Sequence, residues 1–298
     1  MTSFLRRLAS LVLFAALAVS GCARPLPAAT PGPALWRLSD ADSEIWLFGT
    51  VHVLPPALKW RDEKIDAAFA HADTIYFETA TDASAQTTIA AVVQRYGYNP
   101  PGVTLSSLLT PDDRARLARI CARLNVSSTL LEPARPWLAG VQLSVAEVMA
   151  QGQAQAAGVE QVLERDAKAQ NKKRAYFETA EEQIRYFADL DTKVQVQFLS
   201  ATLREIENEP SDVATLDDAW ARGDVKTLSH DLTRDLRSAG PEIYAALIRD
   251  RNRRWAEQID LMMKGSGTAF IAVGAAHLVG KDGVPALLRA KGYKVEGP

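Results

Sequence analysis

Two of the clearest strand signals in this chain lie near its opposite ends, and both run into glycine, two further residues and histidine. The first is residues 45–52 (IWLFGTVH) and the second is residues 270–277 (FIAVGAAH). Short apolar runs bounded by a glycine are consistent with strands buried on both faces of a sheet. We expect the glycine to let the backbone turn sharply, so that the histidine faces a pocket at the sheet rim. If these strands are neighbours, His52 and His277 meet in one place.

Strand patterns are concentrated at both ends of the chain, and the region between them reads mostly as helix. The sequence therefore predicts a mixed α/β fold whose central sheet uses both chain ends, with a large helical insertion. The closing strand, helix and strand fit a parallel βαβ-like unit. The predicted strands are residues 35–38, 44–49, 74–78, 174–178, 268–273 and 293–296.

A second repeat supplies carboxylates. The string YFETA occurs at residues 76–80 and again at 176–180. Each copy places a glutamate, Glu78 or Glu178, at the end of an apolar run and before a threonine suited to capping a helix. Ligands of open α/β sheets bind outside the carboxyl ends of the strands, so these glutamates and the two histidines are expected at one centre.

Two imidazoles with carboxylates suit a divalent metal such as Zn, Mn or Co. We predict His52, Glu78 and His277 as metal ligands, with Glu78 as ligand or general base and Glu178 as a further catalytic acidic residue. The same set works without a metal, with a glutamate holding the water and a histidine acting as acid. Alternatively, the histidines only cap backbone groups, and Glu178 only contacts a helix N-terminus.

Three polar residues before the last core strand, Arg249, Asn252 and Arg253, fall at i, i+3 and i+4 and would share a helix face. One interpretation is a solvated basic face. In the other, Arg249 points into the pocket and binds a substrate carboxylate or carbonyl. The remaining histidines, His71 and His230, are expected to be structural or exposed.

The N-terminus reads as a targeting segment. Arg6 and Arg7 precede an apolar stretch too short to span a bilayer, which ends in Val19-Ser20-Gly21-Cys22 and resembles a bacterial lipobox. The resemblance implies a lipoprotein signal peptide over residues 1–21 and a lipid anchor on Cys22, followed by a tether rich in proline and alanine to residue 34. The alanine at position 23, directly after the cysteine, favours a protein anchored in the outer membrane and facing the periplasm. An ordinary secretory signal is the alternative.

Composition excludes one class of partner. The formal net charge is -2 and there is no long basic tract, so nothing supports nucleic-acid binding. We expect a peptide or small-molecule substrate, and a membrane contact through the anchor alone.

Residues 47–52, 76–78 and 272–280, supported by 178–183 and 251–255, resemble the TraB/GumN family, which is similar to the Tiki proteases. The resemblance covers residues 35–298 as one domain. It implies an active centre of His52, Glu78 and His277. It also implies a metal-dependent envelope hydrolase, with a peptidase as the favoured type. Glu160 stands where the family pattern has aspartate. A metal-independent esterase or amidase, or a protein that binds a ligand or peptide signal without turning it over, remains the alternative.

Overall fold

The computed structural model describes residues 32–151, 158–208 and 213–298. The predicted signal peptide and Cys22 lie outside the described residues. No helix in these three ranges is long and apolar enough to cross a membrane.

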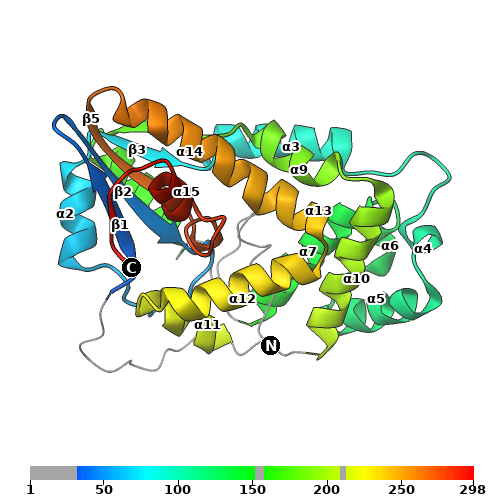
Figure 1. The fold of residues 1–298 in the computed structure, drawn as a ribbon. Helices are drawn as coiled ribbons and strands as arrows, with labels where there is room; N and C mark the ends of the chain where they lie inside the picture. The colour runs from blue at the N-terminus through cyan, green and yellow to red at the C-terminus, as the bar shows by residue number, and fades with distance from the viewer. Residues whose placement is uncertain (1–31, 152–157, 209–212) are drawn as a thin grey trace.

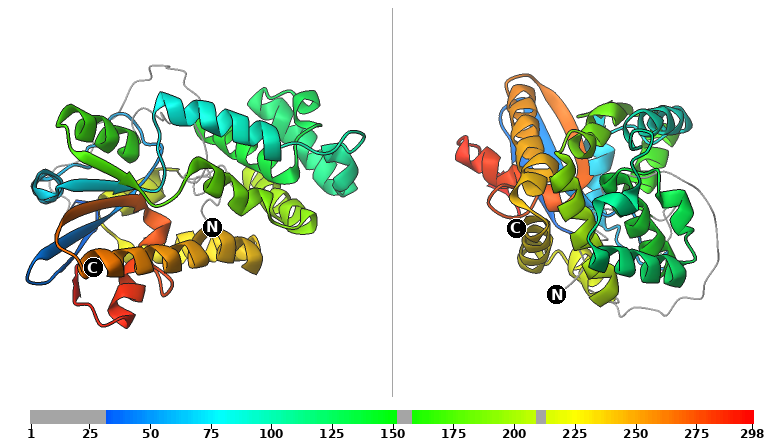
Figure 2. Two further views of the ribbon diagram at one scale, coloured as in Figure 1. Left: turned by 90° about the horizontal axis from the view of Figure 1, so that it is seen from above. Right: turned by 90° about the vertical axis from the view of Figure 1, so that its right-hand side faces the viewer.

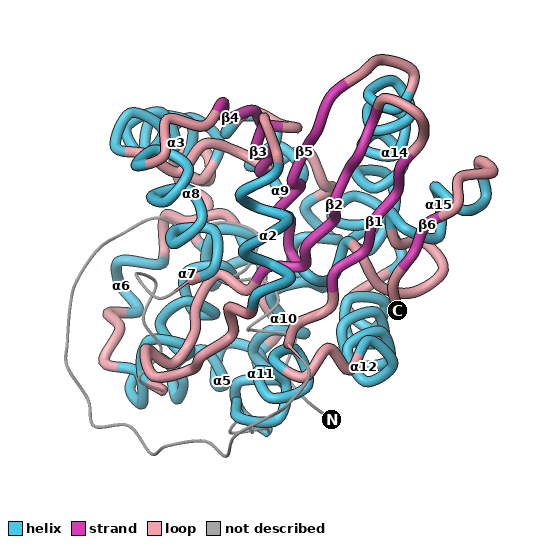
Figure 3. Tube along the Cα trace, turned by 90° about the vertical axis from the view of Figure 1, so that its left-hand side faces the viewer, coloured by secondary structure: helices cyan, strands magenta, loops and turns pink. Residues whose placement is uncertain are grey.

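The described strands form a six-stranded sheet in the order β4-β3-β5-β2-β1-β6, visible side by side in Figure 3. The four strands from β4 to β2 are parallel, whereas β1 is antiparallel to both of its neighbours. Their bounds are β1 Leu35–Ser39, β2 Ser43–Thr50, β3 Thr74–Phe77, β4 Lys173–Tyr176, β5 Gly267–Gly274 and β6 Val295–Glu296. The predicted α/β fold with a sheet built from both chain ends is confirmed. The closing strand β6, however, pairs with β1 and is separated from β5 by two strands.

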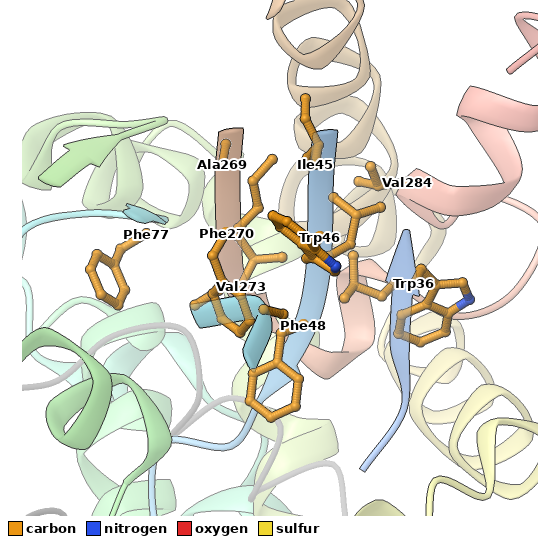
Figure 4. Close-up of a cluster of buried hydrophobic side chains, with 14 of the residues drawn as sticks. Trp36, Ile45, Trp46, Phe48, Phe77, Ala269, Phe270, Val273 and Val284 are labelled. Carbon is orange, nitrogen blue, oxygen red and sulfur yellow. The ribbon is translucent and has the colours of Figure 1, made fainter. Parts of the chain in front are cut away.

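Helices cover both faces of the sheet. In Figures 1 and 3, α2 (Glu63–His71) and α8 (Val159–Ala169) lie on one face, and α14 (Asp250–Met263) and α15 (Val284–Ala290) lie on the other. This double cover explains the continuous apolar runs of β2 and β5. Figure 4 shows the aromatic side chains gathered on these strands, where the Phe48 and Phe270 rings lie 5.7 Å apart.

The helical insertion lies beside the sheet, as Figures 1 and 2 show. Its buried side chains form a second hydrophobic core. The side chains of Thr179 and Glu182 form a capping box that opens α9 (Ala180–Ala188). After α9 ends, Asp191 accepts from the Lys193 N–H and starts a new helix. The helices of this part are α3 Ala83–Tyr96, α4 Leu105–Leu108, α5 Pro111–Leu124, α6 Ser128–Leu131, α7 Pro136–Ala150, α9 Ala180–Ala188, α10 Thr192–Asn208 and α13 Pro241–Tyr244.

Two further helices, α11 (Val213–Ala221) and α12 (Val225–Ser238), pass below the sheet edge in Figure 1. The indole of Trp220 on α11 donates to the Gly49 carbonyl at 2.8 Å. This bond fixes α11 against the end of β2, and so places a helical wall beside the carboxyl edge of the sheet.

Candidate active site at the carboxyl edge of the sheet

The four side chains predicted at strand ends lie at the ends of four adjacent parallel strands. Along the edge from β4 to β2 they are Glu178, Glu78, His277 and His52. Since the carboxyl ends of parallel strands share one edge, the sheet itself brings the two repeats together. His277 belongs to η3 (Ala275–His277), a short 3₁₀ turn directly after β5.

The two glycines of the repeated pattern allow close approach and do not act by an unusual turn. Neither Gly49 nor Gly274 has a positive φ. A Cβ on Gly49 would lie 3.1 Å from the Ala275 Cα, and one on Gly274 would lie 3.1 Å from the Glu78 Oε1. Real Cβ atoms rarely tolerate such contacts, so these positions require glycine for space and not for a positive φ.

A buried arginine that the sequence interpretation did not select joins these side chains. Arg251 is 1% exposed, and all five of its N–H donors have partners. Its Nε and one terminal nitrogen donate hydrogen bonds to the Glu178 carboxylate. The same terminal nitrogen also donates to Glu78 at 2.6 Å. The other terminal nitrogen reaches the Leu247 carbonyl and the His277 Nε2. The two YFETA glutamates therefore converge on one guanidinium.

Glu78 is buried but held as a carboxylate. Its Oε1 accepts the Gly274 N–H at 2.8 Å, and its Oε2 accepts from Arg251 and from the Gln183 amide. Burial alone would raise the pKa of Glu78, but Arg251 and, less strongly, the nearby histidines and the Gly274 N–H lower that pKa to about 2. Glu78 is thus ionised at any physiological pH.

His277 is neutral and fixed through both ring nitrogens. Its Nδ1 lies 2.6 Å from the Asn252 Oδ1, and its Nε2 lies 3.1 Å from Arg251. A guanidinium can only donate, so Nε2 accepts and Nδ1 carries the proton. Burial, followed by the charge of Arg251, lowers the pKa of His277 to about 3 against the opposing effect of Glu78.

His52 differs from His277 because 26% of its side chain is exposed and because it pairs with an acid. Its Nδ1 lies 2.7 Å from Oε2 of Glu160, whose other oxygen accepts from the Thr50 hydroxyl. Burial works against the imidazolium, but Glu160, and then Glu78, outweigh it and hold the pKa of His52 above its ordinary value. Glu160, which departs from the family aspartate, is buried at the start of α8 and reaches the His52 ring.

Asn252 contacts His277 in this centre, whereas the other polar candidates pair with acids elsewhere. Arg249 pairs with Asp250 and keeps 40% of its side chain exposed. The predicted shared face is wrong, because Asn252 is fully buried whereas Arg253 is 63% exposed. His230 is exposed, as expected, and His71 lies exposed in the last turn of α2.

A signal for Arg251 was present in the sequence. Trp255, Ile259 and Met263 are apolar at four-residue spacing, and all three are buried on α14. Extending that spacing back by one turn reaches Arg251, which places it on the buried face.

Two of the predicted metal ligands, His277 and Glu78, already have other partners. Both nitrogens of His277 and both oxygens of Glu78 are engaged, and a guanidinium lies between the two side chains. Among the described residues, no group of three His, Cys, Asp or Glu side chains is placed to hold a metal ion. As arranged here, the donor atoms do not fit a bound metal.

A pocket opens above Glu78 and His277 at the edge of the sheet. Its walls come from the ends of β2 and β5, from α11 and α12, and from η2 (Ala245–Arg249), a π-helical turn that leads into α14. The fold and site thus define an α/β protein with a buried, charged polar network beneath an apolar pocket. Such a pocket with a few convergent polar groups is the usual form of a small-molecule or active site.

This chain belongs to the TraB/PrgY/gumN family, whose model matches residues 34–297. Neither the curated proteins nor the solved structures gave a match.

Proposed function

We propose that this protein is a hydrolase of ester or amide bonds, and that His52 is its general base. The observation that carries the proposal is the 2.7 Å distance between Nδ1 of the partly exposed His52 imidazole and the buried Glu160 carboxylate, beside a pocket with Glu78 and His277 in its lining. A carboxylate on one ring nitrogen fixes the imidazole and stabilises its protonated form.

In the proposed reaction the Nε2 of His52 takes a proton from a water molecule as that water attacks the substrate carbonyl. When the tetrahedral intermediate collapses, the C–O or C–N bond breaks, and the His52 imidazolium returns the proton to the departing alcohol or amine. Glu160 holds Nδ1 and stabilises the imidazolium, and Thr50 holds Glu160. The floor of the pocket is held in one arrangement, because Arg251 is hydrogen-bonded to both Glu78 and His277.

The test compares hydrolysis of p-nitrophenyl esters and fluorogenic peptides by the wild type and by His52→Ala and Glu160→Gln. Both variants should lose at least tenfold in kcat/KM, because general-base catalysis contributes about 10²–10⁴-fold. His230→Ala is the matched control, since His230 also lies 2.9 Å from an acid but is exposed. Full activity of the His52 variant would refute the role of the base.

Metal dependence, predicted from the resemblance, is a separate proposal. The observation in its favour is charge, because two buried glutamates face one guanidinium in the centre. Metal analysis of the purified domain and activity after chelation decide the question. Equal, negligible metal in the wild type, His52→Ala and His277→Ala, with activity that survives chelation, would reject it. Ligand-induced heat stability with no product from any substrate would instead support the binding-protein alternative.

We further propose that the protein is an envelope lipoprotein anchored through Cys22, facing the periplasm from the outer membrane, and that its substrate is a peptide or small molecule. The lipobox-like segment supports the anchor, and the apolar pocket supports the substrate class.

A further inference from the structure

The pocket above the polar centre lies where separate hydrophobic cores meet. Trp220, Leu228 and Leu232 belong to the core around the sheet. Ile248 belongs to the helical core, and Val53 to a third, small cluster. Protein interiors are close-packed, so a gap bordered by apolar side chains from three clusters leaves room for a ligand that the chain does not supply.

Helical spacing places apolar side chains of α11 and α12 on the faces that line the pocket. Leu216 and Trp220 are one turn apart on α11, and Leu228 and Leu232 are one turn apart on α12. Residues at i and i+4 share a helix face, so each helix presents two apolar side chains to the pocket. The cavity enclosed by the walls is small, about 40 Å³, so it takes a short aliphatic group, and a longer group would extend towards its mouth.

The charged groups of the lining restrict what enters. Glu78 and Asp217 are both buried and both line the pocket. His277, also in the lining, is neutral at physiological pH. A ligand that brought its own carboxylate would approach the Glu78 carboxylate, whose cation Arg251 is not among the residues that line the pocket, and like charges repel strongly where water is excluded.

Resting on the proposed hydrolase function, we propose that this pocket binds an uncharged aliphatic group of the substrate next to the cleaved bond. An ester acyl chain and an apolar amino-acid side chain share this chemistry. The pocket would then set specificity by chain length and exclude substrates with a free carboxylate in that group.

The first test uses the wild type with p-nitrophenyl acetate, butanoate and hexanoate. Burying one methylene group is expected to raise kcat/KM about fourfold, until the pocket is full. Leu232→Phe, which narrows the pocket, should lower the hexanoate-to-acetate ratio by about tenfold or more, and Leu228→Ala should raise it. Leu261→Phe is the matched control, because Leu261 is 67% exposed on α14. The same ratio in all four proteins would overturn the proposal.

A second readout does not need turnover. Hexanol should raise the Tm of the wild type and should raise that of Leu232→Phe less, whereas hexanoate should have little effect because of its charge. Stabilisation by hexanol without cleavage of any ester or peptide would retain the pocket and reject the hydrolase. Ester cleavage with no dependence on chain length and no stabilisation by hexanol would retain the hydrolase and reject the pocket. If a variant does not fold by circular dichroism, the wild-type ester series and the two hexyl ligands decide alone.

Discussion

Replacing Arg251 by methionine should destabilise the protein strongly and in a pH-dependent way. Methionine keeps an apolar stem but leaves Glu78 and Glu178 buried without their shared cation. Removing one partner of a buried ion pair costs about 3–5 kcal/mol. Glu78 gives a similar figure, because its pKa falls from the ordinary 4.5 to about 2, and each pKa unit corresponds to about 1.4 kcal/mol.

The sign of the pH effect follows from the pKa of Glu78. In the wild type this pKa is depressed, so the stabilisation is present above about pH 4.5 and is lost as the pH falls towards 2. In Arg251→Met, burial without a cation raises the pKa above 4.5, so the folded state binds a proton that the unfolded state releases. The variant should therefore gain stability as the pH falls from 7 to 5, where this group leaves the wild type unchanged.

Urea unfolding at pH 7 and pH 5 measures the free energy of unfolding of both proteins. The deficit should be about 3–5 kcal/mol at pH 7 and smaller by about 1 kcal/mol or more at pH 5. Adding Glu78→Gln and Glu178→Gln to the variant should restore part of the loss at pH 7. Arg253→Met, at a 63% exposed site on the same helix, should stay within about 0.5 kcal/mol of the wild type. A loss under about 1 kcal/mol, or one equal at both pH values, would refute the reasoning.

Four further predictions follow from single contacts or segments. Activity should rise with pH through the pKa of His52, and its midpoint should lie above the ordinary 6.5, because the base must be neutral; a pH–rate profile of kcat/KM checks this. Asn252→Asp should raise the pKa of His277 from about 3, measured by NMR titration of the ring, and an unchanged value would contradict the Nδ1 contact. Thr179→Ala should lower the free energy of unfolding by about 1 kcal/mol in urea, since it removes the cap of α9. Cys22→Ala should abolish incorporation of labelled palmitate into the full chain in a bacterial host, whereas labelling at the wild-type level would reject the anchor.

The edge cluster could be predicted because its signals are local. An apolar run followed by a glycine marks the carboxyl end of a strand within about eight residues, and parallel strands align such ends. The order Glu178, Glu78, His277, His52 along the edge was not accessible, since it depends on strand pairings between residues up to about 220 positions apart in the chain. The identity of two YFETA strings did not show that one arginine would hold both glutamates.

The choice of Arg249 failed because helical spacing was applied to polar residues instead of apolar ones. Polar residues at i, i+3 and i+4 define a face, but only burial decides whether it meets solvent or the core. Glu160 was noticed as a departure from a family pattern, and its partner could not be assigned, since His52 and Glu160 are joined by tertiary packing alone.

The excess of carboxylates over cations gives the proposed general base a physical reason. Glu78 and Glu178 together outweigh Arg251, and Glu160 adds a further acid at His52. Such a centre disfavours a negative ligand but favours the arrival of a proton, and both Glu160 and Glu78 raise the pKa of His52. When a substrate covers the pocket and excludes water, these attractions strengthen, because the local dielectric constant falls. The proton taken from the attacking water would thus be held most firmly when the substrate is in place, which links occupation of the apolar pocket to the strength of the base.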